Sequence, residues 1–164
     1  MTRPPVAAFA AGIVAVLGLA GLIRGAVPQA AVSAGGAATD PIVISGAYVR
    51  EPASPDVAAA YFTIYNTTGS DDGLLSVASG AGEDAVLHSD GDMTATPGIL
   101  IIPAHSSVTL SPGKRHVMIE HLLGPLRPGQ YVNLQLVFES AGPVNVSAPV
   151  IALTAPAPTA GAPR

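Results

Sequence analysis

Cysteine is absent from this chain of 164 residues, and its absence excludes several kinds of site. Without cysteine there is no disulfide framework, no thiolate metal site and no thiol nucleophile. A blue-copper electron-transfer centre is excluded as well, because such a centre requires a cysteine thiolate. A lipid anchor on cysteine is excluded for the same reason. Any metal ion must therefore be bound by histidine, methionine, carboxylate or backbone groups.

Positive charge and aromatic side chains are also scarce. Lys114 is the only lysine, the net charge is −4 at pH 7, and aromatic residues make up 4% of the chain. With no basic cluster and no aromatic stripe, the sequence argues against nucleic acid as a partner. A glycine-rich phosphate loop and a recognisable Ser-His-acid context are missing too. We therefore predict that the protein is not an enzyme.

One long apolar run is present, at the N-terminus. It extends from Val6 to Ile23 and follows Arg3. Its length is near the ~20 residues that cross a bilayer and exceeds the roughly 7–15 of a signal-peptide core. We assign residues 1–25 to a signal peptide or a membrane anchor; a small-residue cleavage site at 32–34 suits the first. Either fate predicts an extracytoplasmic protein, in the periplasm or cell envelope or secreted.

Three further regions follow this leader. Residues 26–40 form a linker of small, weakly polar residues, residues 41–153 form one domain, and residues 154–164 form a tail rich in alanine and proline. The linker and the tail cannot bury enough apolar surface to fold alone, so we expect the tail to be disordered.

The domain has the pattern of an all-β protein. Short runs of β-branched and aromatic residues are separated by glycine, proline, asparagine and aspartate at the roughly 8–12-residue spacing of a β-sandwich. Alternation is clearest from Tyr131 to Glu139, where Val132, Leu134 and Leu136 would share one face. No segment is convincingly helical, although Pro55–Ala60 could form one turn. The predicted strands cover residues 42–49, 59–65, 74–78, 85–88, 99–102, 107–110, 116–121, 131–139 and 144–151.

Four residues carry the chemistry of a metal site. The only methionines after the initiator lie close to histidines, as His88-(x4)-Met93 and His116-Val117-Met118. Two imidazoles and two thioethers suit Cu(I), because soft sulfur donors select that ion over hard cations. We predict that His88, Met93, His116 and Met118 bind one Cu(I) ion.

Strand geometry predicts where this site lies. His116 and Met118 are two residues apart in a predicted strand, so both side chains project from the same face. His88 ends another strand, and Met93 follows in a loop that contains Gly91 and is flexible enough to fold its thioether over the metal. The site is therefore expected at one edge of the sandwich, partly exposed.

Other polar residues near these ligands are given simpler roles. We expect His105 and His121 to be solvent-exposed, with His121 facing away from Met118 by strand alternation. It would assist in holding oxidised copper only if the strand bends. Asp90 and Asp92 lie beside the proposed ligands, where a place on the loop surface is a simpler account than tuning of the cation.

The same residues carry a family resemblance. The run "IVISGAYVREPASPDVAAA", followed by "YFTIYNTTG", "AVLH", "IPAHSSVTLSPG", "HVM" and "LRPGQYVNLQLVF", resembles the periplasmic copper(I) chaperones, PCu(A)C-like, that serve the CuA centre of cytochrome c oxidase. The likeness covers about residues 42–151. It implies a cupredoxin-like, Greek-key β-sandwich that binds Cu(I) through a His, a Met and a closing His-x-Met. By position these are His88, Met93, His116 and Met118.

The resemblance also implies a partner, and the sequence departs from the family pattern in one place. The implied acceptor of copper is a cytochrome c oxidase subunit or an assembly factor, reached through transient docking; handover from one site is compatible with the monomer that we expect. The loop after His88 is shorter than in the family, so Met93 is the ligand that this change affects. Without it three ligands remain. The His- and Met-rich C-terminal extension of some relatives is absent.

Two other classes of function stay open at this level. A tethered structural or adhesion β-sandwich would have no metal affinity. A buffering protein for zinc or Cu(II) would use His88, His116 and His121 and would be insensitive to substitution of Met118.

Overall fold

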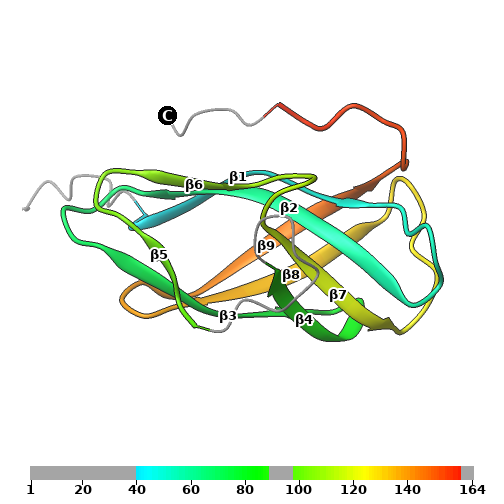
Figure 1. The fold of residues 1–164 in the computed structure, drawn as a ribbon, viewed down its shortest axis with the longest axis horizontal. Helices are drawn as coiled ribbons and strands as arrows, with labels where there is room; N and C mark the ends of the chain where they lie inside the picture. The colour runs from blue at the N-terminus through cyan, green and yellow to red at the C-terminus, as the bar shows by residue number, and fades with distance from the viewer. Residues whose placement is uncertain (1–39, 89–97, 160–164) are drawn as a thin grey trace, which may run out of the picture. The chain divides into compact units, whose positions relative to one another are not determined.

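Nine β-strands form the part of the chain that the computed structural model describes, residues 40–88 and 98–159 (Figure 1). The all-β prediction is confirmed, and every strand overlaps the run predicted for it. Met93, Asp90 and Asp92 lie outside the described residues, as do the leader and most of the linker. Nowhere in the described ranges does a helix occur that could cross a membrane. The strands are β1 (Ile42–Arg50), β2 (Val57–Asn66), β3 (Asp72–Ser79), β4 (Gly82–His88), β5 (Leu100–Ile102), β6 (Ser107–Leu110), β7 (His116–Leu122), β8 (Tyr131–Phe138) and β9 (Gly142–Ile151).

The helical turn suggested for Pro55–Ala60 is wrong. Strand β2 begins at Val57, and its first residues pair with β7, Val57 opposite Glu120 and Ala60 opposite Val117. Alanine is a strong helix former, but a sheet position satisfies the backbone groups of this segment and buries Ala58 and Ala60 in the core. Tertiary pairing therefore overrides the local preference.

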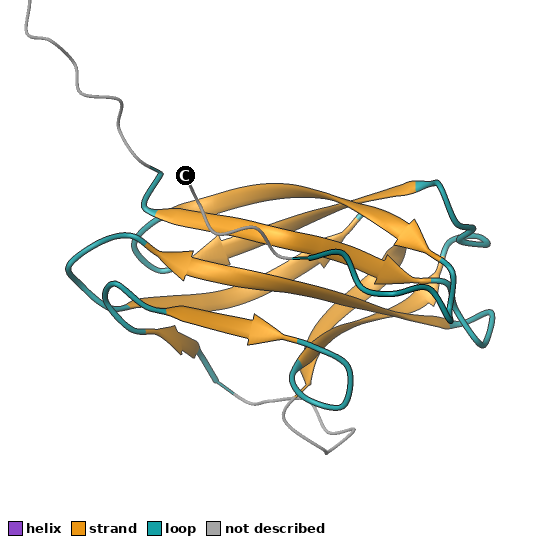
Figure 2. Ribbon diagram, turned by 90° about the horizontal axis from the view of Figure 1, so that it is seen from above, coloured by secondary structure: helices purple, strands orange, loops and turns teal. Residues whose placement is uncertain are grey.

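The strands form one curled sheet in the order β4-β7-β2-β1-β9-β8-β3-β5, with β6 paired to β2 (Figures 1 and 2). Neighbouring strands are antiparallel except β1 and β9, which run parallel where Val49 and Arg50 meet Val150 and Ile151. This short parallel pairing joins the two halves of the sheet. The curl also brings β3 beside β4, so that the inner faces enclose a core.

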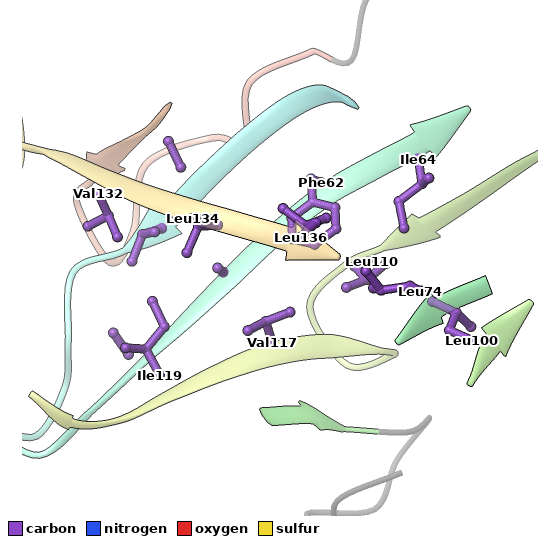
Figure 3. Packing of buried hydrophobic residues seen from close by; sticks show 14 of the residues in the cluster. Phe62, Ile64, Leu74, Leu100, Leu110, Val117, Ile119, Val132, Leu134 and Leu136 are labelled. Carbon is purple, nitrogen blue, oxygen red and sulfur yellow. The ribbon is translucent and has the colours of Figure 1, made fainter. Parts of the chain in front are cut away.

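The core contains the alternate residues of several strands (Figure 3). Val132, Leu134 and Leu136 of β8 are at most 2% exposed, as the alternation predicts. Val117 and Ile119 of β7 are fully buried and face the same core. Each such side chain contributes about 1.5–3 kcal/mol relative to an exposed one. Burial of Val117 and Ile119 thus fixes the orientation of β7. The alternate residues His116 and Met118 face away from the core.

A buried carboxylate links β3 to the turn between β8 and β9. Asp72 is 6% exposed, and its two oxygens accept hydrogen bonds from the backbone N–H groups of Gly73, Ser140 and Ala141 at 2.8, 2.8 and 3.0 Å. A buried carboxylate is stable only with such donors. Asp72 therefore holds two distant segments together.

Arg50, at the end of β1, fixes the first residues beyond β9. Its guanidinium donates hydrogen bonds to the carbonyl oxygens of Ala152, Leu153 and Ala155, and it lies 5.5 Å from the centre of the Tyr48 ring. From Ala152 to Thr159 the chain has no strand or helix. The start of this segment is nevertheless held against β1.

Candidate metal centre

Strands β4 and β7 bring two of the predicted ligands together. His88 and His116 are direct partners in the antiparallel pairing of these strands. Their rings stack, with centroids 5.3 Å apart and an angle of 24° between the planes. Residues separated in the sequence by β5 and β6 therefore form one pair of imidazoles.

Met118 completes the described part of the predicted ligand set. It lies between Val86 of β4 and Ala59 of β2, its partners in the two pairings. Because Val117 and Ile119 point into the core, His116 and Met118 share the outer face of the sheet, as predicted. The structure thus brings His88, His116 and Met118 to one face.

A glycine allows β4 and β7 to approach closely. A Cβ atom on Gly82 would lie 2.5 Å from the carbonyl oxygen of Glu120 and 2.7 Å from Cγ2 of Ile119. Real Cβ contacts are never so short, so a larger residue would push the strands apart. Gly82 therefore helps to set the register that ends with His88 opposite His116.

The hydrogen bond of His116 defines which of its nitrogens is free. Nδ1 lies 2.9 Å from the carbonyl oxygen of Lys114. A carbonyl only accepts hydrogen bonds, so Nδ1 carries the proton and donates it. In the neutral ring Nε2 then keeps its lone pair, which is the form that a metal ion requires.

His88 is much more buried, at 5% exposure. Its Nδ1 is buried without a hydrogen-bond partner among the residues that the structure describes. Its Nε2 lies 3.9 Å from Oε1 of Glu120. Leaving a buried polar nitrogen unpaired costs about 1–3 kcal/mol, so His88 is poised to take a ligand.

The side chain of Met118 lies beside a surface groove. Met118 is 9% exposed and lines a groove of about 500 Å³. The groove walls include Val57, Tyr61, Pro112 and Leu153, so they are largely apolar. A ligand from another molecule can therefore approach the Met118 side chain from the groove.

Two tyrosines that the sequence analysis did not single out continue the row of rings across the sheet. The Tyr61 ring lies 6.2 Å from that of His116, and the Tyr48 ring lies 5.1 Å from that of Tyr61. Spacing shows only that Tyr61, two residues beyond Ala59 in a predicted strand, shares a face with Ala59. Which strand would lie next to it was not predictable.

Burial raises the pKa of Tyr48 and of Tyr61 above the ordinary value of 10.0, and the nearby Arg50 offsets part of the rise. A raised folded-state pKa means that the folded protein keeps these protons when the unfolded chain loses them. Stability is therefore fully present below pH 10 and falls as the pH rises through the folded pKa values.

We expect urea midpoints of the wild type to fall from about pH 10 upward. The variant Tyr48→Phe with Tyr61→Phe keeps both rings and has no phenols to ionise, so its midpoint should fall less steeply. Equal slopes in the two proteins would show that other groups cause the loss.

The other two histidines are exposed, as predicted. Both have a left-handed backbone, with φ of 51°. At His121 this conformation interrupts strand alternation, and Nδ1 lies 3.3 Å from Oδ2 of Asp84. Within the described ranges no three His, Asp or Glu side chains gather closely enough to hold a metal ion. A site made of His88, His116 and His121 therefore has no geometric support there.

Comparison with known proteins gives one family model and several solved structures. The model, described as "Putative lipoprotein LpqE-like", matches residues 42–150. No curated protein matches the sequence.

The similar structures are PCuAC domains and DR1885. The copper-bound PCuAC domain from PmoF2 is 27% identical, with a TM-score of 0.61, over 68% of this chain and 93% of that one. The apo PCuAC domain from PmoF1 is 28% identical, with a TM-score of 0.63, over 68% and 94%. The solution structure of Cu(I)-DR1885 from Deinococcus radiodurans is 32% identical, with a TM-score of 0.57, over 71% and 83%.

Proposed function

The chain belongs to the LpqE-like family and has the fold of PCuAC domains, and from this premise we propose that it is an extracytoplasmic copper chaperone that binds one Cu(I) ion. The observation that carries the proposal is the stacked pair His88 and His116 with the Met118 thioether on the same face. Imidazole and thioether are donors that suit Cu(I). Two of the similar structures are described as copper-bound or Cu(I) forms.

Met93 is the proposed fourth ligand. It belongs to the segment that connects His88 to β5, outside the described residues. Met93 is only five positions beyond His88 in the sequence, so this segment can bring a second thioether to the metal. The two thioethers together would make the site softer and more selective for Cu(I).

The described geometry supports release as well as binding. Met118 lines the open groove, whereas His88 is almost completely buried. An incoming ligand therefore reaches His116, which is half-buried, and Met118 before it reaches His88, and copper can pass donor by donor without entering free solution. We propose transient docking with a copper acceptor, either the CuA-bearing subunit of cytochrome c oxidase or an assembly factor, by a monomeric chaperone.

The proposed location follows from the N-terminal sequence. The family description names lipoproteins, but no cysteine occurs among the 164 residues to carry a lipid. Residues 1–25 would instead export the domain and, if retained, would anchor it to the membrane.

The direct test is an anaerobic Cu(I) titration of the chain against a chromophoric chelator. We expect one tightly bound equivalent in the wild type and loss of competitive binding when His116→Ala and Met118→Ala are combined. The control is His105→Ala, which removes an exposed histidine in a turn and should bind like the wild type. Absence of competitive binding by the wild type would leave a tethered β-sandwich without a copper function.

A further inference from the structure

Glu120 is the third residue of β7 on the outer face, two positions beyond Met118. Its carboxylate reaches back toward the buried imidazole of β4, so that Oε1 lies 3.9 Å from Nε2 of His88. The Glu120 side chain is 35% exposed, whereas that of His88 is 7% exposed. A partly exposed carboxylate thus faces one particular nitrogen of a buried histidine.

The surroundings of His88 favour one of its two neutral forms. A neutral imidazole carries a single proton, on Nδ1 or on Nε2. A proton on Nδ1 would be a buried donor with no acceptor among the described residues, and the lone pair of Nε2 would face the Glu120 carboxylate. A proton on Nε2 points at that carboxylate instead and leaves the lone pair on Nδ1. The second arrangement removes the buried donor without an acceptor and the contact between a lone pair and the carboxylate, and the polar atom that stays unpartnered is the Nδ1 acceptor.

His116 shows the same principle with the opposite nitrogen. The Lys114 carbonyl takes the proton of Nδ1, so Nε2 is the free donor. Metal-bound histidines characteristically donate their other N–H to a carboxylate or a backbone carbonyl, which fixes the ring and makes it a better ligand. Lys114 supplies the carbonyl for one ring, and Glu120 supplies the carboxylate for the other.

We propose that Glu120 is a positioning residue of the copper site, which holds His88 with its proton on Nε2 and so leaves Nδ1 as the copper donor. The proposal rests on the proposed function, because it names the donor atom for the same ion. The 3.9 Å separation is longer than a hydrogen bond, and contacts of this kind often tighten only when the ligand binds. Strand alternation alone places Glu120 on this face, but only the pairing of β4 with β7 brings it to His88.

The first test needs no metal. Ring ¹⁵N chemical shifts of the metal-free chain report which nitrogen of His88 carries the proton. We expect Nε2–H in the wild type and in Glu120→Gln, whose amide oxygen still accepts a hydrogen bond. Glu120→Leu should shift the ring toward a mixture of the two forms. A wild-type His88 protonated on Nδ1, or an unchanged ratio in Glu120→Leu, would overturn the proposal.

The second test is Cu(I) affinity in the chelator assay. Loss of a residue that orients a metal ligand costs about 10–100-fold in affinity, which is the decrease that we expect for Glu120→Leu, with most of the affinity kept by Glu120→Gln. Asp84→Asn is the matched control. Asp84 lies directly across from Glu120 in the pairing of β4 with β7, and its carboxylate contacts His121. This variant should leave affinity unchanged. Urea midpoints of all three variants verify that they are folded.

The two tests separate the two proposals. A wild type that binds no Cu(I) would remove the copper role of Glu120 together with the proposed function. A wild type that binds tightly beside a Glu120→Leu variant of equal affinity would overturn the positioning role alone.

Discussion

Replacing Met118 with leucine is expected to weaken Cu(I) binding by more than about 100-fold, beyond the cost of losing a group that only orients a ligand. Leucine has nearly the volume of methionine but no sulfur lone pair. Met118 is 9% exposed between Ala59 and Val86, so the leucine side chain can take its place. Volume-conserving exchanges of this kind usually cost less than about 1.5 kcal/mol in the free energy of unfolding. A loss of Cu(I) binding in this variant would therefore result from the loss of the sulfur donor and not from unfolding.

Chelator competition under anaerobic conditions measures the Cu(I) affinity, and parallel titrations with zinc and Cu(II) measure the response to harder ions. A chaperone that depends on thioether donors should lose Cu(I) affinity in Met118→Leu and keep it in His121→Ala, since His121 is exposed beside Asp84. The opposite pattern, with tight zinc or Cu(II) binding that ignores Met118 and requires His121, would favour the histidine-based buffering protein.

Replacing Asp72 with alanine is expected to lower the free energy of unfolding by about 3 kcal/mol, since three backbone N–H groups would lose their acceptor in a partly buried place. Gly73, Ser140 and Ala141 all donate to this carboxylate. The loss separates the start of β3 from the turn between β8 and β9. The metal ligands lie on β4 and β7, so Cu(I) affinity of the folded variant should stay the same.

Urea unfolding measures this loss, and two further variants bracket it. Asp72→Asn retains one acceptor oxygen and should lose about half as much stability as alanine. Asp71→Ala removes an exposed carboxylate that accepts one hydrogen bond, from the N–H of Ala104 at 2.9 Å, and should cost about 0.5–1.5 kcal/mol. A loss in Asp72→Ala no larger than in Asp71→Ala would show that water replaces the carboxylate without penalty.

The strands were predictable because their signal is local. The alternation of apolar and polar residues in β8 predicts one buried face directly. The turns between strands contain glycine, proline, asparagine and aspartate at the spacing of a β-sandwich. The wrong helical turn at Pro55–Ala60 shows the limit of this signal. Alanine by itself favours a helix, and the pairing with β7 overrides that local preference.

Part of the candidate site was also local. His116 and Met118 share a face because they are two residues apart in a strand, and the same period includes Glu120. The absence of cysteine, the scarcity of methionine and the nearness of both methionines to histidines then narrow the metal to a soft ion. None of this depends on which strands are neighbours.

The sequence by itself therefore determined the strands, the face on which each ligand lies and the chemistry of the donors. Only the tertiary structure decided that His88 stacks on His116, that Glu120 faces Nε2 of His88 and that Asp72 holds a distant turn. The physical reason is that strand periodicity specifies a face but not a partner. Partners are chosen by the packing of the whole core, in which every strand must bury its apolar face and satisfy its backbone hydrogen bonds at once.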